Sequence, residues 1–184
     1  MVKVVIHFRE RDHTVKKPFS TAFIRPSRFR FEYIEIKPLV KTSKFIAYQN
    51  GQDIKAHWDL AQGVSQINTI GEALALAAGI SGGSARTVPT MLLPDKSHFR
   101  NAILFFSSPK RTVDEVIDGI DCYRIEDPND YRDLTLWIDK EEFLLRKMYV
   151  EKDLKDSQAE TITTYEPILN GEVTEKMLEF GSPK

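Results

Sequence analysis

The strict alternation of charged and aromatic residues in the stretch "RFRFEY", residues 28–33, constrains the fold more than any other feature of this chain. On a β-strand, successive side chains point to opposite faces of the sheet. Phe29, Phe31 and Tyr33 therefore share one face, and Arg28 and Arg30 are expected to face water on the other. The stretch predicts a strand with one apolar and one charged face.

Most of the remaining chain also has the composition or the period-2 pattern of strands. The predicted strands cover residues 3–8, 16–24, 29–36, 45–49, 54–58, 101–106, 112–117, 120–126, 134–139, 143–150, 160–165 and 174–180. The dipeptides Asn50-Gly51, Asp118-Gly119 and Asn170-Gly171 supply the positive φ angles that tight hairpins need. Short strands joined by hairpins predict a mainly β fold with antiparallel strands.

The helical insert at about residues 65–94 is the exception to this pattern. "INTIGEALALAAGI" has helical propensity and is apolar nearly all the way round, so it must be buried on several sides or cover an equally apolar surface. A sheet with an aromatic face then has two solutions, a solid core or a helical lid over a hydrophobic cavity. Packed interiors are the norm, which favours the solid core on this evidence alone. No domain boundary is evident, and residues 1–184 are expected to form a single domain.

The overall charge argues against a nucleic-acid surface, which interleaved basic and aromatic residues would otherwise allow. The chain has 26 basic and 27 acidic residues and a net charge of −1, so it has no global field to attract phosphate backbones. No apolar run approaches the roughly 20 residues of a membrane span. Neither a nucleic-acid partner nor stable membrane insertion is expected.

No set of residues predicts catalysis or a cofactor. "GISGG" at Gly79–Gly83 matches the nucleophile elbow G-x-S-x-G, but that motif needs a strand before the serine and here a helix precedes Ser81. Asp53, His57 and Asp59 could converge as metal ligands on one strand face, although a solvated face is the ordinary interpretation. The single cysteine, Cys122, is expected to be a small buried apolar residue. An enzyme is the least favoured class, and neither a metal nor a cofactor is expected.

Four stretches taken together resemble the LolA/LolB-like outer-membrane lipoprotein-sorting superfamily, in particular its branch of predicted periplasmic proteins. They are "RPSRFRFEY", "AYQNGQDIKAHW", "GEALALAAGISGGSARTVPTMLLP" and the C-terminal region from "DGIDCYRI" through "LWID" to "LEFGSP". The resemblance implies a strongly curved antiparallel half-barrel whose concave face is closed by a short helical lid. It also implies a cavity that takes acyl chains without chemistry, and this cavity is then favoured over the solid core.

The resemblance implies a set of ligand-binding side chains and one residue that latches the lid. The ligand-binding residues expected are Phe19, Phe23, Phe29, Phe31, Tyr33, Tyr48, Trp58, Leu74, Leu76, Met91, Leu92, Phe105, Tyr123 and Trp137. The latch expected is Arg25, the arginine of an early "RP" dipeptide, in contact with the lid near residues 81–87. A surface arginine at a strand end is the alternative for Arg25.

The function predicted is therefore non-catalytic binding of lipid acyl chains or of a lipidated protein, as a periplasmic carrier whose leader has been removed. The chain starts on a strand-like segment, which by itself is compatible with cytosol or periplasm. An envelope protein is the further partner that the resemblance implies. The alternative function is an envelope sensor or interaction domain with a filled core, which binds its partner through a sheet edge or its outer face.

Overall fold

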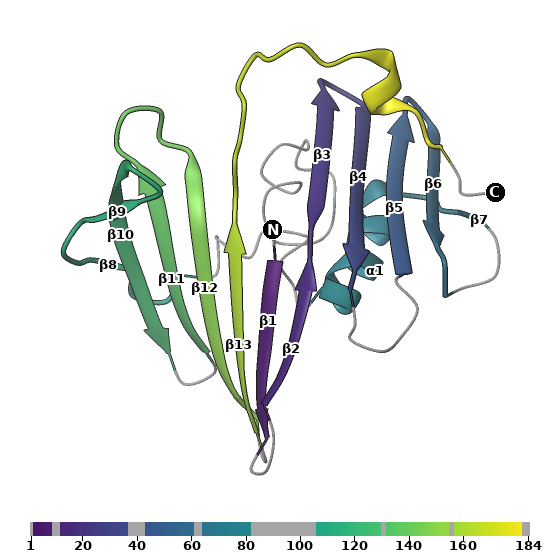
Figure 1. The fold of residues 1–184 in the computed structure, drawn as a ribbon. Helices are drawn as coiled ribbons and strands as arrows, with labels where there is room; N and C mark the ends of the chain where they lie inside the picture. Colours follow the sequence, from purple (N-terminus) through teal and green to yellow (C-terminus); the bar gives the residue numbers. More distant parts are fainter. Residues whose placement is uncertain are drawn as a thin grey trace. The chain divides into compact units, whose positions relative to one another are not determined.

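The protein forms two compact units in a computed structural model. The structure describes residues 2–8, 12–36, 43–60, 64–81, 106–129, 132–154 and 157–181. The first unit comprises Met1–Lys16 and Phe106–Asn170, and the second comprises Lys17–Phe105 and Gly171–Lys184. Each unit contains one antiparallel sheet, and the two are described in turn (Figure 1).

The sheet of the first unit has eight strands in the order β2-β1-β13-β12-β11-β10-β8, with β9 also paired to β10. The strands are β1 (Val2–Phe8), β2 (Asp12–Lys17), β8 (Lys110–Arg111), β9 (Glu115–Ile117), β10 (Ile120–Asn129), β11 (Arg132–Asp139), β12 (Leu145–Leu154) and β13 (Ser157–Thr164). The interior strand β11 is covered on both faces: Leu136 on one face and Trp137 on the other are 1% and 6% exposed. All four residues of "LTLW" are buried, so this part of the strand has no exposed side.

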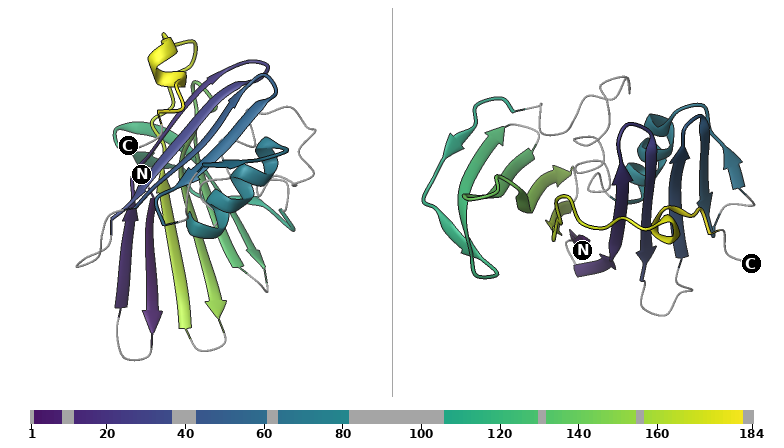
Figure 2. Two further views of the ribbon diagram at one scale, coloured as in Figure 1. Left: turned by 90° about the vertical axis from the view of Figure 1, so that its right-hand side faces the viewer. Right: turned by 90° about the horizontal axis from the view of Figure 1, so that it is seen from above.

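The second unit holds a five-stranded sheet, one helix and a short 3-10 helix. The elements are β3 (Phe19–Ile24), β4 (Arg28–Glu35), β5 (Ser43–Asn50), β6 (Asp53–Trp58), β7 (Val64–Gln66), α1 (Ile70–Ser81) and η3 (Glu175–Leu178). The strands follow one another in chain order across the sheet. Helix α1 lies against one face, in contact with β5 and β6, while η3 contacts β3 and β4 (Figure 2).

The strand β4 confirms the alternation that the sequence predicts. Phe29, Phe31 and Tyr33 are at most 1% exposed and belong to one hydrophobic cluster. Arg28 and Arg30 lie on the other face, as predicted, but their side chains are only 32% and 17% exposed. Acidic side chains cover them in part, so these arginines are less open to water than the sequence indicates.

Helix α1 begins at a capping arrangement that its sequence encodes. The hydroxyl of Thr69 accepts a hydrogen bond from the Glu72 backbone N–H at 3.2 Å. The Glu72 carboxylate in turn accepts one from the Asn68 backbone N–H at 3.1 Å. This variant of the capping box satisfies two backbone donors and defines where the helix starts.

Several predicted strands differ from the structure, two of them for a clear local reason. Of the predicted strand 112–117, only Glu115–Ile117 is a strand. Residues 174–180 were predicted to be a strand, which is wrong: Glu175–Leu178 forms η3, because Glu, Lys, Met and Leu all favour helical over extended backbone. The predicted strand 16–24 is split at Pro18, which has no N–H to donate. The predicted strand 101–106 lies outside the described residues except for Phe106, which is not in a strand.

The turns at Gly51 and Gly119 follow the prediction, but Asn170-Gly171 forms no hairpin, because no strand follows it within residues 172–181. One further turn contains a residue that no pattern signals. Gly51 and Gly119 have φ angles of 60° and 82°, and Asp118 has 50°, so the two-residue turn 118–119 is of the type I′ that suits hairpins. Phe143, in the loop between β11 and β12, has a φ of 56° and is 69% exposed. A bulky residue rarely adopts this left-handed conformation.

The fold class predicted from the sequence is confirmed: the protein is mainly β, its strands pair antiparallel, and a short apolar helix covers part of a sheet. The strands are divided between two sheets. The prediction of a single domain stays a prediction. Within the described ranges, no helix has the length and apolar character needed to cross a membrane.

The left-handed backbone at Phe143 predicts an unusual response to substitution. Both Phe143→Gly and Phe143→Ala remove the exposed ring, but only glycine adopts a positive φ without a steric cost. We expect the glycine variant to be more stable than the alanine variant by about 1 kcal/mol in urea-induced unfolding. An alanine variant as stable as the glycine variant would show that residue 143 leaves the left-handed region at no cost.

Candidate functional site

The apolar face of the β3–β7 sheet is the candidate site, and we call it the aromatic face. Cross-strand pairing arranges its side chains in three rows. The rows are Phe19–Tyr33–Phe45–Trp58, Thr21–Phe31–Ala47–Ala56 and Phe23–Phe29–Gln49–Ile54. The outer rows carry most of the aromatic rings, while the middle row has small residues on β5 and β6. The middle row is therefore where another element can approach the sheet most closely.

Helix α1 packs on the aromatic face where the side chains are small. Ala73 of α1 is 0% exposed and belongs to the same cluster as Ala47 and Ala56, with Ile70 packed at its edge. Alanines on both partners allow the helix backbone to approach the sheet closely. Among side chains that the structure describes, α1 thus contributes little apolar volume to this contact.

The rings of the aromatic face pack against one another across and along its strands. Tyr33 stacks on Phe45 with ring centroids 5.3 Å apart, and Phe19 approaches Phe31 at 5.9 Å. Phe23 meets Phe29 edge-on at 6.3 Å. Each such pair contributes roughly 0.5–1.5 kcal/mol beyond the burial of its area. The face is therefore a preformed apolar surface, and it is largely covered in this structure.

Two buried polar atoms of the aromatic face lack a partner in the described part of the chain. They are the hydroxyl Oγ1 of Thr21 and the indole Nε1 of Trp58. Buried tryptophan N–H groups usually find an acceptor. These two atoms therefore give the aromatic face a hydrogen-bonding capacity that no described group uses.

The structure brings together several of the predicted ligand-binding residues but not all of them. Those that lie on the aromatic face are Phe19, Phe23, Phe29, Phe31, Tyr33 and Trp58. Tyr48 lies on the opposite face of the same sheet, paired with Arg30 and Lys55. Leu76 of α1 is 54% exposed. Met91, Leu92, Phe105 and the side chain of Leu74 lie outside the described residues.

Tyr123 and Trp137 belong to the first unit and lie on opposite faces of its sheet. Tyr123 pairs with Ile138, whereas Trp137 pairs with Arg124 and Lys147. The ring of Trp137 is flanked by these two cations and its Nε1 donates to Glu115 at 2.7 Å. Trp137 is therefore part of a polar network. Ligand binding by either residue stays a prediction.

Arg25 is exposed in the turn between β3 and β4, next to a cis peptide bond to Pro26. Of its expected partners on the lid, residues 82–87 lie outside the described part of the chain. The role of Arg25 as a latch stays a prediction. Ser81 is the last residue of α1, so the helix that precedes it does not provide the strand that a nucleophile elbow needs.

Sequence reasoning missed Phe45, Ala47 and Ala56, which complete the aromatic face. The stretch "KFIAY" on β5 has apolar residues on both faces, so alternation alone does not say which side is inward. The hairpin turn after β5 does indicate which side faces inward. A two-residue hairpin at Gly51-Gln52 pairs Asn50 with Asp53, and this register places Tyr48 opposite Lys55.

The opposite face of this sheet is charged and internally paired. Arg28 binds Glu175 of η3, with Nη1 to Oε1 at 2.9 Å, and Arg30 pairs with Glu32. The considered metal trio does not converge there, because Asp53 pairs with Lys55 while His57 contacts Asp59 at 3.0 Å. In the described ranges, no three His, Cys, Asp or Glu side chains are grouped to hold a metal ion.

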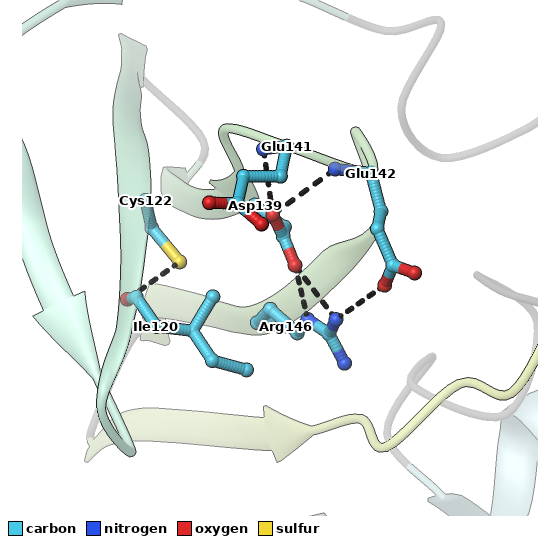
Figure 3. A network of polar contacts seen from close by, with 6 residues as sticks. All are labelled: Ile120, Cys122, Asp139, Glu141, Glu142 and Arg146. Atoms are coloured by element: carbon cyan, nitrogen blue, oxygen red, sulfur yellow. Dashed lines mark hydrogen bonds and ion pairs between the residues drawn. The ribbon is translucent and has the colours of Figure 1, made fainter.

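A buried polar network in the first unit anchors the loop between β11 and β12 (Figure 3). Asp139, 4% exposed, accepts hydrogen bonds from Arg146 Nη2 at 2.6 Å and from the backbone N–H groups of Glu141 and Glu142 at 2.8 and 3.2 Å. The Arg146 guanidinium, followed by these backbone donors, lowers the pKa of the Asp139 carboxyl. These hydrogen bonds tie the turn after β11 to Asp139.

Cys122 sits beside this network, paired across the sheet with Asp139. It is 0% exposed, as predicted, and its thiol lies 3.5 Å from the carbonyl oxygen of Ile120. Burial, with a smaller contribution from the Asp139 charge, raises the pKa of the Cys122 thiol. A buried thiol that resists ionisation is a poor nucleophile, so Cys122 does not indicate covalent chemistry.

Comparison with known proteins finds similar structures but no similar sequences. No family model matches the chain, and no curated protein is similar to it. Among solved structures, it is similar to a DUF1329 family protein from Desulfovibrio piger, with 14% identity and a TM-score of 0.39, over 97% of this chain and 87% of that one.

Two further structures are similar over comparable lengths. One is described as an outer membrane lipoprotein-sorting protein domain from Vibrio parahaemolyticus, with 12% identity and a TM-score of 0.35, over 96% of this chain and 86% of that one. The other is a LolA superfamily protein from Nitrosomonas europaea, with 10% identity and a TM-score of 0.35, over 97% and 87%. These descriptions name the superfamily that the sequence resembles.

The Asp139–Arg146 pair predicts a specific acid sensitivity. A carboxyl whose pKa is lowered on folding stabilises the protein above its unfolded pKa of about 3.9. That contribution is lost as the pH falls through the lower folded value. We expect Asp139→Asn to lower the melting temperature at pH 7, and the difference from wild type to shrink below about pH 4. The exposed Asp133→Asn is the matched control, and a pH-independent difference for Asp139→Asn would contradict the assignment.

Proposed function

We propose that this protein binds the acyl chains of a lipid or of a lipidated protein, without chemistry, between the aromatic face and helix α1, as a periplasmic carrier. The observation that carries the proposal is the composition of the contact: on β5 and β6, a short helix covers part of a largely aromatic face through Ala73. Ala73 and Ile70 are the described α1 side chains in this contact. A ligand that displaces α1 thus replaces a modest apolar contact.

The burial of an acyl chain can be compared with that of the described helix contacts. Burial of an alanine and part of an isoleucine contributes on the order of 3 kcal/mol, whereas about twelve methylene groups at about 0.8 kcal/mol each contribute roughly 10 kcal/mol. An acyl chain can therefore offset the loss of the described helix contacts. Flat aromatic rings in the outer rows suit a flexible chain, because they offer area without requiring one fixed shape.

A second function is favoured by a different observation. Phe29, Phe31, Tyr33 and Phe45 are at most 2% exposed, which is the expected state of a filled core. In that case the protein is an interaction or sensor domain of the cell envelope. The end strands of the sheet, β3 and β7, then offer backbone groups for strand addition by a partner.

Binding of a fluorescent fatty acid, dansyl-undecanoic acid, separates these two functions. The carrier proposal predicts saturable binding with enhanced dansyl emission, and a melting temperature that rises with ligand concentration, because a ligand that binds only the folded state stabilises it. No emission change and no shift in melting temperature would leave the filled core as the better account.

The role of α1 predicts the effect of one buried substitution. Ala73→Gln places an amide against the aromatic face, which weakens helix docking by roughly 1–2 kcal/mol and populates the undocked helix about tenfold more. We expect probe uptake in stopped-flow fluorescence to be about tenfold faster, with a lower melting temperature. Leu60→Gln, at a residue that is 55% exposed in the same unit, is the matched control. Unchanged uptake in Ala73→Gln would show that α1 does not control access.

A further inference from the structure

The indole N–H of Trp58 stands out among the groups of the aromatic face. Its Nε1 is buried and has no acceptor in the described ranges. Buried tryptophan N–H groups usually have an acceptor, and the other tryptophan of the chain does: Trp137 Nε1 donates to Glu115 Oε2 at 2.7 Å. A buried donor without a partner is destabilising, so an acceptor supplied by a ligand would remove that penalty.

Trp58 occupies the end of an aromatic row. It pairs with Phe45, which pairs with Tyr33, which pairs with Phe19, so the row crosses four strands. Trp58 also packs against the edge of the buried cluster. A chain lying along the aromatic face would therefore meet this N–H where β6 ends.

The surroundings of Trp58 select the kind of acceptor. The described side chains of the three rows are aromatic, aliphatic or neutral polar, and none carries a charge. An ionised carboxylate or phosphate buried there would have no described counter-ion on this face and would lose its hydration. A neutral carbonyl oxygen can accept the hydrogen bond at a much smaller desolvation cost. The acceptor that fits is the carbonyl of an ester or an amide.

We infer that Trp58 Nε1 donates a hydrogen bond to the carbonyl oxygen of an ester- or amide-linked acyl chain, and that the site thereby distinguishes acyl chains from alkyl chains. The inference rests on the proposed function, since it assigns the polar anchor of the same ligand. Ester-linked lipids and N-acylated proteins share this carbonyl. Trp58 is thus a specificity-determining residue, and the rings of the face supply the affinity that does not depend on chain type.

A matched pair of ligands tests this directly. Myristoyl lysophosphatidylcholine carries an ester carbonyl, and its ether-linked analogue with the same chain and headgroup lacks it. Each competes with dansyl-undecanoic acid below the concentration of micelle formation, in wild type and in Trp58→Phe. We expect the ester to bind wild type about fivefold to tenfold more tightly, the value of one net hydrogen bond. In Trp58→Phe the two ligands should bind equally, with the ether affinity within about twofold of wild type.

A second variant identifies which donor is responsible. Thr21→Val removes the other buried polar group of the aromatic face that has no described partner, the hydroxyl of Thr21, a residue that pairs with Phe31 in the middle row. We expect the preference for the ester to survive in Thr21→Val. If it is lost there and retained in Trp58→Phe, the carbonyl binds elsewhere and the inference is overturned.

The outcomes separate this inference from the proposed function. Equal binding of ester and ether by wild type would overturn the role of Trp58 while leaving acyl-chain binding intact. If neither lysolipid competes and the dansyl probe does not bind, the proposed function fails and the inference fails with it. Circular dichroism and melting temperature check that Trp58→Phe is folded, and exchange of this indole for phenyl breaks no hydrogen bond to a described residue.

Discussion

The pairing of β4 between β3 and β5 is the constraint on which the second unit depends. Because each cross-strand pair shares a face, the alternation within β4 is imposed on its neighbours, and the rings of four strands collect on one side. The charged residues collect on the other side, where they pair with one another. A slip by one residue would place Phe29, Phe31 and Tyr33 among the arginines, so burial and charge pairing specify the same register.

The first unit also contains an antiparallel sheet, but its side chains are buried in a different pattern. Its interior strand β11 is buried on both faces, and the loop that follows it depends on one carboxylate. Asp139 gathers the Arg146 guanidinium and two backbone donors of the loop, so the buried charge is paired and hydrogen-bonded. This network explains how the loop can keep Phe143 in a left-handed conformation that costs about 1–2 kcal/mol.

The candidate site follows from small residues as much as from aromatic ones. Ala47, Ala56 and Ala73 let α1 approach the sheet, and they also make its described contact modest in area. An apolar binding surface must be covered when no ligand is bound, because exposed rows of aromatic rings would favour aggregation. Trp58 Nε1 is, with Thr21 Oγ1, one of two buried polar groups on this face that have no described partner, which a filled core does not explain. The proposed ligand-binding face supplies an acceptor for the Trp58 N–H when a ligand is bound, whereas a closed core supplies none.

Local alternation and backbone preference are enough to predict the mainly β class, the turns at Gly51 and Gly119 and the apolar face of β4, because each depends on a few neighbouring residues. The same reasoning misplaced Tyr48, since β5 carries apolar residues on both sides and its polar partner follows from hairpin register. It also predicted a strand at residues 174–180, where four residues with helical preference form η3 against β3 and β4. Which side chains of β3, β5 and β6 join the aromatic face, and the burial of Trp58 Nε1, emerge only on folding. Register and packing join segments that are distant in the chain, and no local pattern encodes them.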